Sequence, residues 1–143
     1  MLNRSLFSSA TGEWETPQDV FDALDAEFGG FDLDPCATPE NAKCSNYYTQ
    51  EEDGLAKPWR GKVFVNPPYG RGIKWWIRRC YVAAGSTASL VVALIPSRTD
   101  TAWWHDYVMK ASEIRFIRGR LHFDGHKNGA PFPSAIVVWR PPC

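Results

Sequence analysis

Long apolar stretches are missing from this sequence of 143 residues. No run reaches the roughly 18 apolar residues that a membrane span needs, and the first five residues lead into no apolar stretch of signal-peptide length. We therefore expect no membrane association, no export and a cytoplasmic location. With 44% hydrophobic and 14% aromatic residues, the composition is typical of a folded globule and excludes a disordered tail.

Cysteine is scarce, with four residues in the chain. None belongs to a CxxC pair, and the three histidines do not complete a zinc spacing. We therefore expect reduced structural thiols and no bound metal. Internal repeats and convincing linkers are also missing, so we expect one domain over residues 13–143, preceded by a flexible N-terminus over residues 1–12.

An excess of charge of one sign is missing from the whole chain but not from its halves. The net charge is zero, yet residues 1–53 hold 2 basic and 12 acidic side chains, whereas residues 54–143 hold 14 basic and 4 acidic ones. Such asymmetry predicts an acidic face and a basic face, the latter suited to a polyanion, unless folding intermixes the two halves. Charge alone does not establish nucleic-acid binding.

Apolar periodicity predicts strands that alternate with helices, which indicates an α/β layered sheet with an antiparallel pair at its closing edge. Thr16 is the expected N-cap of the first helix and Pro17 its first residue, and Gly29 ends that helix. The continuous apolar run 89–95 is expected to be a central parallel strand. Helices are expected at 17–28, 73–84 and 101–110, strands at 31–34, 62–65, 89–95, 114–117 and 135–139, and one helical turn near 40–44.

The run Asn66-Pro67-Pro68-Tyr69 directly follows an expected strand, at the end where open α/β sheets bind ligands. Two prolines fix two φ angles and remove two backbone donors, which leaves an acceptor-rich loop next to a flat ring. An aromatic amine is a poor nucleophile because its lone pair is delocalised. The Asn66 Oδ1 atom and the Pro67 carbonyl could accept from its two N–H groups and free that lone pair, in the manner of an inverted oxyanion hole.

At these residues the chain resembles the phage DNA N-6-adenine methyltransferase (Dam-type) family. Several segments carry the resemblance in order along nearly the whole chain: 14–17, 31–37, 63–70, 98–105 and 130–134. The resemblance implies a single-domain α/β protein with a reduced Rossmann-like S-adenosylmethionine-dependent methyltransferase fold. It further implies methyl transfer to the exocyclic amino group of adenine in DNA, with Asn66, Pro67, Pro68 and Tyr69 as catalytic residues.

The resemblance also implies cofactor contacts. Thr16-Pro17 is similar to the segment that contacts the methionine end of S-adenosylmethionine, and Asp34-Pro35 to the strand end where the charged amino-acid portion sits. Asp53 resembles the acidic residue that accepts from the cofactor adenine, although an ordinary acidic turn at 51–54 is equally consistent with the sequence. The chain departs from the fold's usual pattern because no glycine follows Cys36 until Gly54. We therefore expect a reduced cofactor half of the sheet.

Substrate contacts are expected from the basic half. Arg71 and Lys74 are candidates for DNA phosphates, Arg98 and Asp100 for the substrate cleft, and Phe132 for a second wall around an extruded base. A solvated helix face is the expectation for Arg78 and Arg79, whereas Arg115, Arg118 and Arg120 are further candidates for phosphate contact. In each of the pairs Trp75-Trp76 and Trp103-Trp104, at least one ring is expected in the core.

The expected partner is DNA, with no obligate protein partner. Two alternatives remain open at this point. One keeps the chemistry and changes the acceptor to cytosine, an RNA base or a protein glutamine. The other is a non-catalytic DNA-binding module that has lost its affinity for the cofactor. Loose sequence selectivity is also expected, because no recognition domain fits in 143 residues.

Overall fold

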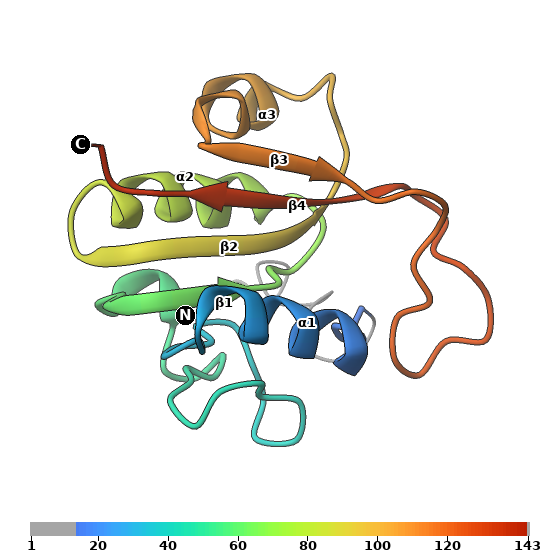
Figure 1. The fold of residues 1–143 in the computed structure, drawn as a ribbon, viewed down its shortest axis with the longest axis horizontal. Helices are drawn as coiled ribbons and strands as arrows, with labels where there is room; N and C mark the ends of the chain where they lie inside the picture. Colours follow the sequence, from blue (N-terminus) through green and yellow to red (C-terminus); the bar gives the residue numbers. More distant parts are fainter. Residues whose placement is uncertain (1–13, 143) are drawn as a thin grey trace.

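The computed structural model describes residues 14–142, in which a four-stranded sheet is flanked by helices (Figure 1). The predicted flexible N-terminus lies outside the described residues. The elements in chain order are α1 (Gln18–Phe28), the 3-10 turn η2 (Gly54–Ala56), β1 (Gly61–Val65), α2 (Ile73–Ala84), β2 (Ala88–Pro96), α3 (Ala102–Asp106), the 3-10 turn η3 (Val108–Lys110), β3 (Glu113–Phe116) and β4 (Ser134–Trp139). The predicted α/β class is confirmed.

The sheet is mixed, with strand order β1-β2-β4-β3. Strand β2 pairs in parallel with β1 and antiparallel with β4, and β4 pairs antiparallel with β3. The predicted antiparallel closing pair is therefore confirmed. The prediction of a central parallel strand at 89–95 is right about position and wrong about pairing on one side. An apolar run reports burial on both faces and carries no information on the direction of a neighbour.

The two longer helices cover opposite faces of the sheet, with α1 in front and α2 behind it in Figure 1. Phe64 points toward α1, where its ring lies 5.2 Å from that of Phe21. Successive side chains of a strand alternate between faces, so Val63 and Val65 point toward the other layer, and both are fully buried. This packing fixes the strand that leads into the Asn-Pro-Pro-Tyr loop.

The predicted strand at 31–34 is reduced to two isolated bridges. Leu33 pairs in parallel with Val63 of β1, and Asp34 pairs in parallel with Tyr47. The strand stays short because the backbone N–H of Asp32 and of Leu33 both donate to the single carbonyl of Lys62. These bridges extend the sheet beyond β1, and they bring Asp34 beside the strand that precedes Asn66.

Three local predictions differ from the structure. Thr16 does not cap α1: Pro17 occupies the N-cap position and has no side-chain hydrogen-bonding group, and the Thr16 hydroxyl accepts from Asn66. The helix expected at 101–110 divides into α3 and η3 at Tyr107, whose φ of −128° lies outside the helical range. The helical turn expected near 40–44 lies at 38–42, where the Asn41 and Ala42 N–H groups both donate to the Thr38 carbonyl, and a 3-10 turn follows at 54–56.

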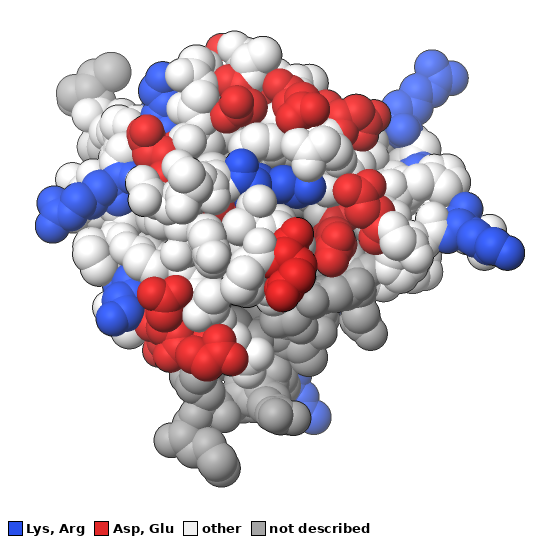
Figure 2. Space-filling view, turned by 90° about the horizontal axis from the view of Figure 1, so that it is seen from below, with Lys and Arg blue, Asp and Glu red and all other residues white. Residues whose placement is uncertain are grey.

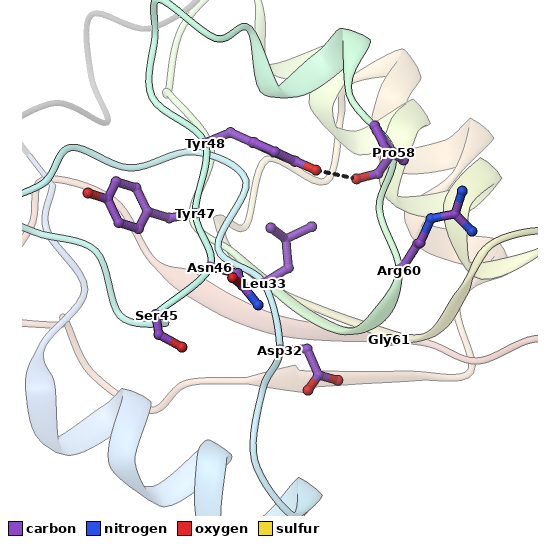
Figure 3. A pocket seen from close by; sticks show the side chains of 9 residues that line it. All are labelled: Asp32, Leu33, Ser45, Asn46, Tyr47, Tyr48, Pro58, Arg60 and Gly61. Carbon is purple, nitrogen blue, oxygen red and sulfur yellow. Dashed lines mark hydrogen bonds between the residues drawn. The ribbon is translucent and has the colours of Figure 1, made fainter.

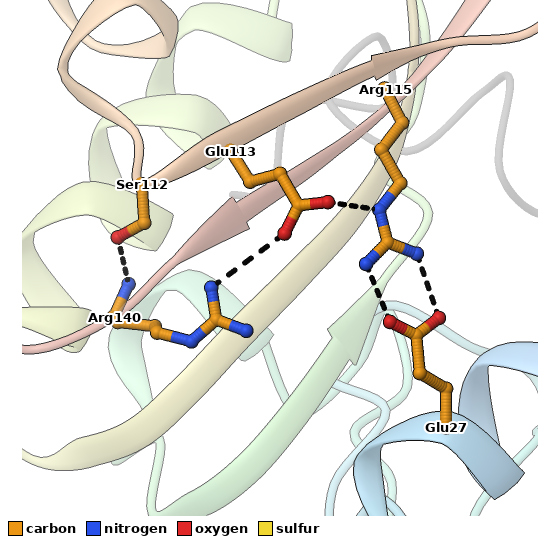
Figure 4. A network of polar contacts seen from close by, with 5 residues as sticks. All are labelled: Glu27, Ser112, Glu113, Arg115 and Arg140. Carbon is orange, nitrogen blue, oxygen red and sulfur yellow. Dashed lines mark hydrogen bonds and ion pairs between the residues drawn. The ribbon is translucent and has the colours of Figure 1, made fainter.

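An ion-pair network ties the first helix to the far edge of the sheet (Figure 4). Arg115 of β3 forms a bidentate pair with Glu27 of α1 and also pairs with Glu113, which Arg140 approaches at 3.8 Å. These carboxylates hold the Arg115 side chain, and their pairing raises the pKa of its guanidinium. Arg115 is therefore structural here, which argues against its predicted phosphate contact.

The remaining general predictions concern thiols, membranes and charge. Cys36, Cys44 and Cys80 are free thiols, and Cys143 lies outside the described residues. Within residues 14–142, no helix is long and apolar enough to cross a membrane. Figure 2 shows the face seen from below, where acidic side chains extend from the upper edge to the lower left and basic side chains lie mostly toward the rim, with one group in the middle.

Candidate active site

The Asn-Pro-Pro-Tyr loop lies at the carboxyl end of β1, as the sequence predicts, and all four residues are buried. Figure 1 shows that the long loop between β3 and β4 extends from the sheet at the same end. Residues 14–16 contact the loop between β3 and β4, where the Asp124 N–H donates to the Glu15 carbonyl. Two segments far apart in sequence thus meet over the Asn-Pro-Pro-Tyr loop.

Asn66 is held by its amide nitrogen. Nδ2 donates to the Trp14 carbonyl oxygen at 2.6 Å and to Thr16 Oγ1 at 3.0 Å. The other end of the amide, Oδ1, is buried and accepts no hydrogen bond from any residue that the structure describes. Buried polar atoms almost always have partners, so an unpaired acceptor at this position indicates a place for a donor that residues 14–142 do not supply.

An aromatic cluster stands beside Asn66. The Tyr69 hydroxyl donates to the Leu94 carbonyl at 3.2 Å, which fixes the ring against β2. The half-buried Phe132 ring meets Tyr69 edge-on at 5.4 Å, and Trp14 and Phe123 contact Phe132 at 5.1 and 5.9 Å. The structure therefore brings the predicted Phe132 wall to Tyr69.

Asp34 shares a small cavity with Asn66 and Thr16, lined also by Glu15, Cys36, Asn41 and Lys43. The cavity measures about 20 Å³, room for about one water molecule. Burial raises the pKa of the Asp34 carboxyl to about 7, against the opposing effect of the Lys43 and Cys36 backbone N–H groups that donate to it. No cluster of three or more His, Cys, Asp or Glu side chains in residues 14–142 is suited to a metal ion.

Asp53 is brought to the same region through its neighbour. Gly54 is buried so tightly that an added Cβ would lie 2.0 Å from the Pro35 carbonyl oxygen, and the Trp59 indole donates to the Gly54 carbonyl at 2.8 Å. Asp53 itself has φ of 56°, in the left-handed region that non-glycine residues rarely adopt. Thr16 and Asp34 of the predicted cofactor segments therefore share one cavity, and the residue after Asp53 touches Pro35.

A larger cavity of about 610 Å³ lies elsewhere (Figure 3). It is lined by Asp32, Leu33, Ser45, Asn46, Tyr47, Tyr48, Pro58, Arg60 and Gly61, and it shares no lining residue with the Asn66 cavity. Gly61 lines the larger cavity and begins β1, whereas Asn66 lines the smaller cavity and follows the end of β1. About 17 Å of extended strand separates these two residues. Since ligands of open α/β sheets bind at the carboxyl ends, we assign the candidate site to the smaller cavity.

The predicted DNA contacts are on the surface. Arg71, Lys74, Arg98 and Asp100 are exposed, and the Arg98 charge acts on the pKa of the Tyr69 hydroxyl, which places Arg98 near the aromatic cluster. Arg78 is exposed, as expected. The same expectation for Arg79 was wrong, because its guanidinium lies 5.0 Å from the Trp59 ring and donates to the Lys57 carbonyl.

The tryptophan pairs follow the prediction that at least one ring of each is in the core. Trp76 is fully buried and Trp75 is 51% exposed, whereas Trp103 and Trp104 are both buried.

Sequence reasoning missed several residues of this region. Trp14 enters the site through a backbone carbonyl, which no side-chain pattern reveals. Phe123 was missed because it stands alone in a polar loop. Ser97 Oγ and Ser134 Oγ are buried without a hydrogen-bond partner among residues 14–142, where β2 ends and β4 begins.

An α/β domain with Asn-Pro-Pro-Tyr at a strand end is the arrangement expected of an amino methyltransferase. Comparison with known proteins leads to the same class. The model of the DNA N-6-adenine-methyltransferase (Dam) family matches residues 5–142. The chain belongs to this family.

Two curated phage relatives carry the same description, DNA N-6-adenine-methyltransferase. That of Escherichia phage T1 is 33% identical over 114 residues, which cover 78% of this chain and 47% of the relative. That of Haemophilus phage HP1 (strain HP1c1) is 30% identical over 136 residues, which cover 90% of this chain and 78% of the relative. The chain thus spans about half the length of the T1 protein and most of the HP1 protein.

Proposed function

We propose that this chain transfers a methyl group from S-adenosylmethionine to the exocyclic amino group of adenine in DNA. The observation that carries the proposal is the buried Asn66 Oδ1 atom, which has no partner among the described residues while Nδ2 is held from behind. An acceptor so placed suits a substrate amine that donates one of its N–H groups. Family membership supports the same acceptor.

The chain's own residues perform three tasks in this proposal. Asn66 Oδ1 and the Pro67 carbonyl accept from the amine and favour a pyramidal nitrogen with its lone pair free. Tyr69 and Phe132, which touch edge-on at 5.4 Å, have to separate to flank the extruded base. Unstacking that base from the duplex costs a few kcal/mol. Arg98 and Asp100 contact the substrate at the cleft, and Arg71 and Lys74 contact phosphates.

S-adenosylmethionine supplies the methyl group when it is bound. The donor set fits this cofactor, because the Asp34 carboxyl suits a group with ammonium and sulfonium charges and lies in one cavity with Thr16 and Asn66. Pro17 and Pro35 directly follow Thr16 and Asp34 in the chain. Asp53 accepts a hydrogen bond from the cofactor adenine in this proposal. A cavity of about 20 Å³ is too small for the methionine portion, so the segment 36–44 has to move outward for binding.

We further propose that the fold is a reduced Rossmann-like methyltransferase sheet. The bridges of Leu33 with Val63 and of Asp34 with Tyr47 support this, because they continue the parallel part of the sheet past β1. The shortness of these bridges agrees with the absence of glycines between Cys36 and Gly54. Two further strand–helix units do not fit in residues 36–61.

Parallel assays with labelled S-adenosylmethionine on DNA, RNA and protein test the proposal. We expect label in DNA, at adenine. Label only in RNA or in a protein glutamine, or in DNA at cytosine, selects the alternative acceptors. Isothermal titration with the cofactor separates the enzyme from a non-catalytic binding module, since the module would give no heat of binding and no label in any acceptor.

A further inference from the structure

The amide of Asn66 is gripped by a strap, which we define as residues 14–17. Its two contacts differ in kind: the Trp14 carbonyl at 2.6 Å is an acceptor only, whereas the Thr16 hydroxyl at 3.0 Å can accept or donate. A carboxamide has two ends of nearly equal shape, and only its chemistry decides which end faces a given partner. The Trp14 carbonyl therefore requires the NH₂ end, and Oδ1 has to face away from the strap.

Thr16 supplies the second half of this grip. One hydrogen bond leaves the amide free to rotate about that bond, whereas two acceptors on the two N–H groups fix its plane. Thr16 is 4% exposed, so its hydroxyl is shielded from bulk water. Its side chain is free for this contact because α1 begins at Gln18 with no side-chain cap.

The strap is itself held from the opposite side. The Trp14 ring stacks on His126 at 4.6 Å and 13° and meets Phe132 edge-on, and Asp124 N–H donates to the Glu15 carbonyl at 3.1 Å. The loop between β3 and β4 thus presses the strap onto Asn66. The orientation of the Asn66 amide is therefore set by contacts with residues outside the Asn-Pro-Pro-Tyr loop.

We propose that Thr16 is a positioning residue of the methyl-transfer reaction: it locks the Asn66 amide so that Oδ1 is presented to the substrate amine. This inference rests on the proposed function. It assigns the Thr16 hydroxyl to Asn66, whereas the family resemblance assigns Thr16 to the cofactor. The two assignments predict different kinetic consequences for the same substitution.

The test compares Thr16→Val, which removes the acceptor, with Thr16→Ser, which keeps it. We expect Thr16→Val to lower kcat about tenfold, the equivalent of about one hydrogen bond, with the cofactor Kd within about threefold of wild type. Thr16→Ser should restore most of kcat. Thr87→Val is the matched control, because it removes a threonine hydroxyl that donates to the Trp59 carbonyl away from the site.

Three outcomes would overturn the assignment. An unchanged kcat in Thr16→Val removes the positioning role. A raised cofactor Kd with unchanged kcat makes Thr16 a cofactor contact only. A kcat that Thr16→Ser fails to restore means that the methyl group and not the hydroxyl matters.

A readout without turnover separates this inference from the proposed function. The Asn66 side-chain NH₂ protons should exchange slowly with solvent in wild-type protein and faster in Thr16→Val, as observed by ¹⁵N-edited NMR. If wild-type protein methylates nothing while this difference persists, the proposed function fails and the grip on Asn66 stands. If the exchange rates are equal, the grip fails whatever the activity.

Discussion

Gly54 and Pro35 touch so closely that a Cβ atom on Gly54 would lie 2.0 Å from the Pro35 carbonyl oxygen, although 19 positions separate them in the sequence. The contact joins two of the segments assigned to the cofactor. Glycine is required here by the close approach of another backbone.

Gly54→Ala should therefore destabilise the protein and weaken cofactor binding together. Relief of the clash has to shift Pro35 or η2, at a cost of about 1–3 kcal/mol in the free energy of unfolding. Gly85→Ala is the control, because its Cβ would meet nothing closer than 3.7 Å and its φ is −87°. Urea denaturation of both variants measures the difference. Equal stabilities would show that the Pro35 contact relaxes without cost.

A pH dependence of stability should arise from Asp34. Its folded pKa of about 7 lies above the ordinary value of 3.8, so the unfolded chain loses this proton at a lower pH than the folded protein does. The Asp34 contribution to stability therefore falls as pH rises from about 4 to about 7 and is constant beyond that window. Asp34→Asn removes the titrating carboxyl group and with it this pH dependence of stability.

The measurement is the free energy of unfolding of wild type and Asp34→Asn at several pH values between 4 and 8. We expect the variant to gain on the wild type as pH rises, even though its cofactor affinity falls. Parallel curves would mean that Asp34 titrates in the folded protein as it does in water.

The sequence predicted the position of the Asn-Pro-Pro-Tyr loop better than it predicted the details of the sheet. Asn66 to Tyr69 could be placed because an apolar strand and two prolines are local signals, and the ligand side of an α/β sheet follows from topology. The grip of Thr16 on Asn66 could not be predicted, since it joins residues 50 positions apart, and a Thr-Pro pair reads equally well as a helix start. Arg79 was misread because helical spacing cannot reveal a ring supplied by a distant loop.

Cofactor binding should slow amide exchange in the segment 36–44, which closes over Asp34 and has to move to admit the methionine portion. Hydrogen–deuterium exchange with and without S-adenosylmethionine measures this effect. Residues 45–48 and 58–61, which line the larger cavity in Figure 3, are the internal control. Protection of the control segments in place of 36–44 would move the cofactor to that cavity.

DNA affinity should depend on salt through residues at the carboxyl end of the sheet. Each neutralised phosphate contributes about −0.9 to the slope of log affinity against log salt, so Arg71→Ala should reduce the magnitude of that slope by about 0.9. Arg140→Ala is the control, because Arg140 follows β4, which runs antiparallel to β2 and ends at the opposite side of the sheet. Fluorescence anisotropy of a labelled duplex gives both slopes. Equal losses in the two variants would remove Arg71 from the phosphate contacts.

The role of Asn66 as the acceptor that activates the adenine amine is tested most directly by the modified nucleosides that the protein leaves in DNA. DNA is incubated with S-adenosylmethionine and either wild type or Asn66→Ala, digested to nucleosides and examined by mass spectrometry. We expect N6-methyldeoxyadenosine from wild type and loss of at least about 99% of it in the variant, in line with removal of one preorganised electrostatic partner, with cofactor affinity nearly unchanged. A variant that retains a tenth of wild-type turnover, or a wild type that marks cytosine instead, would contradict the assignment of Asn66 Oδ1 to the adenine amine.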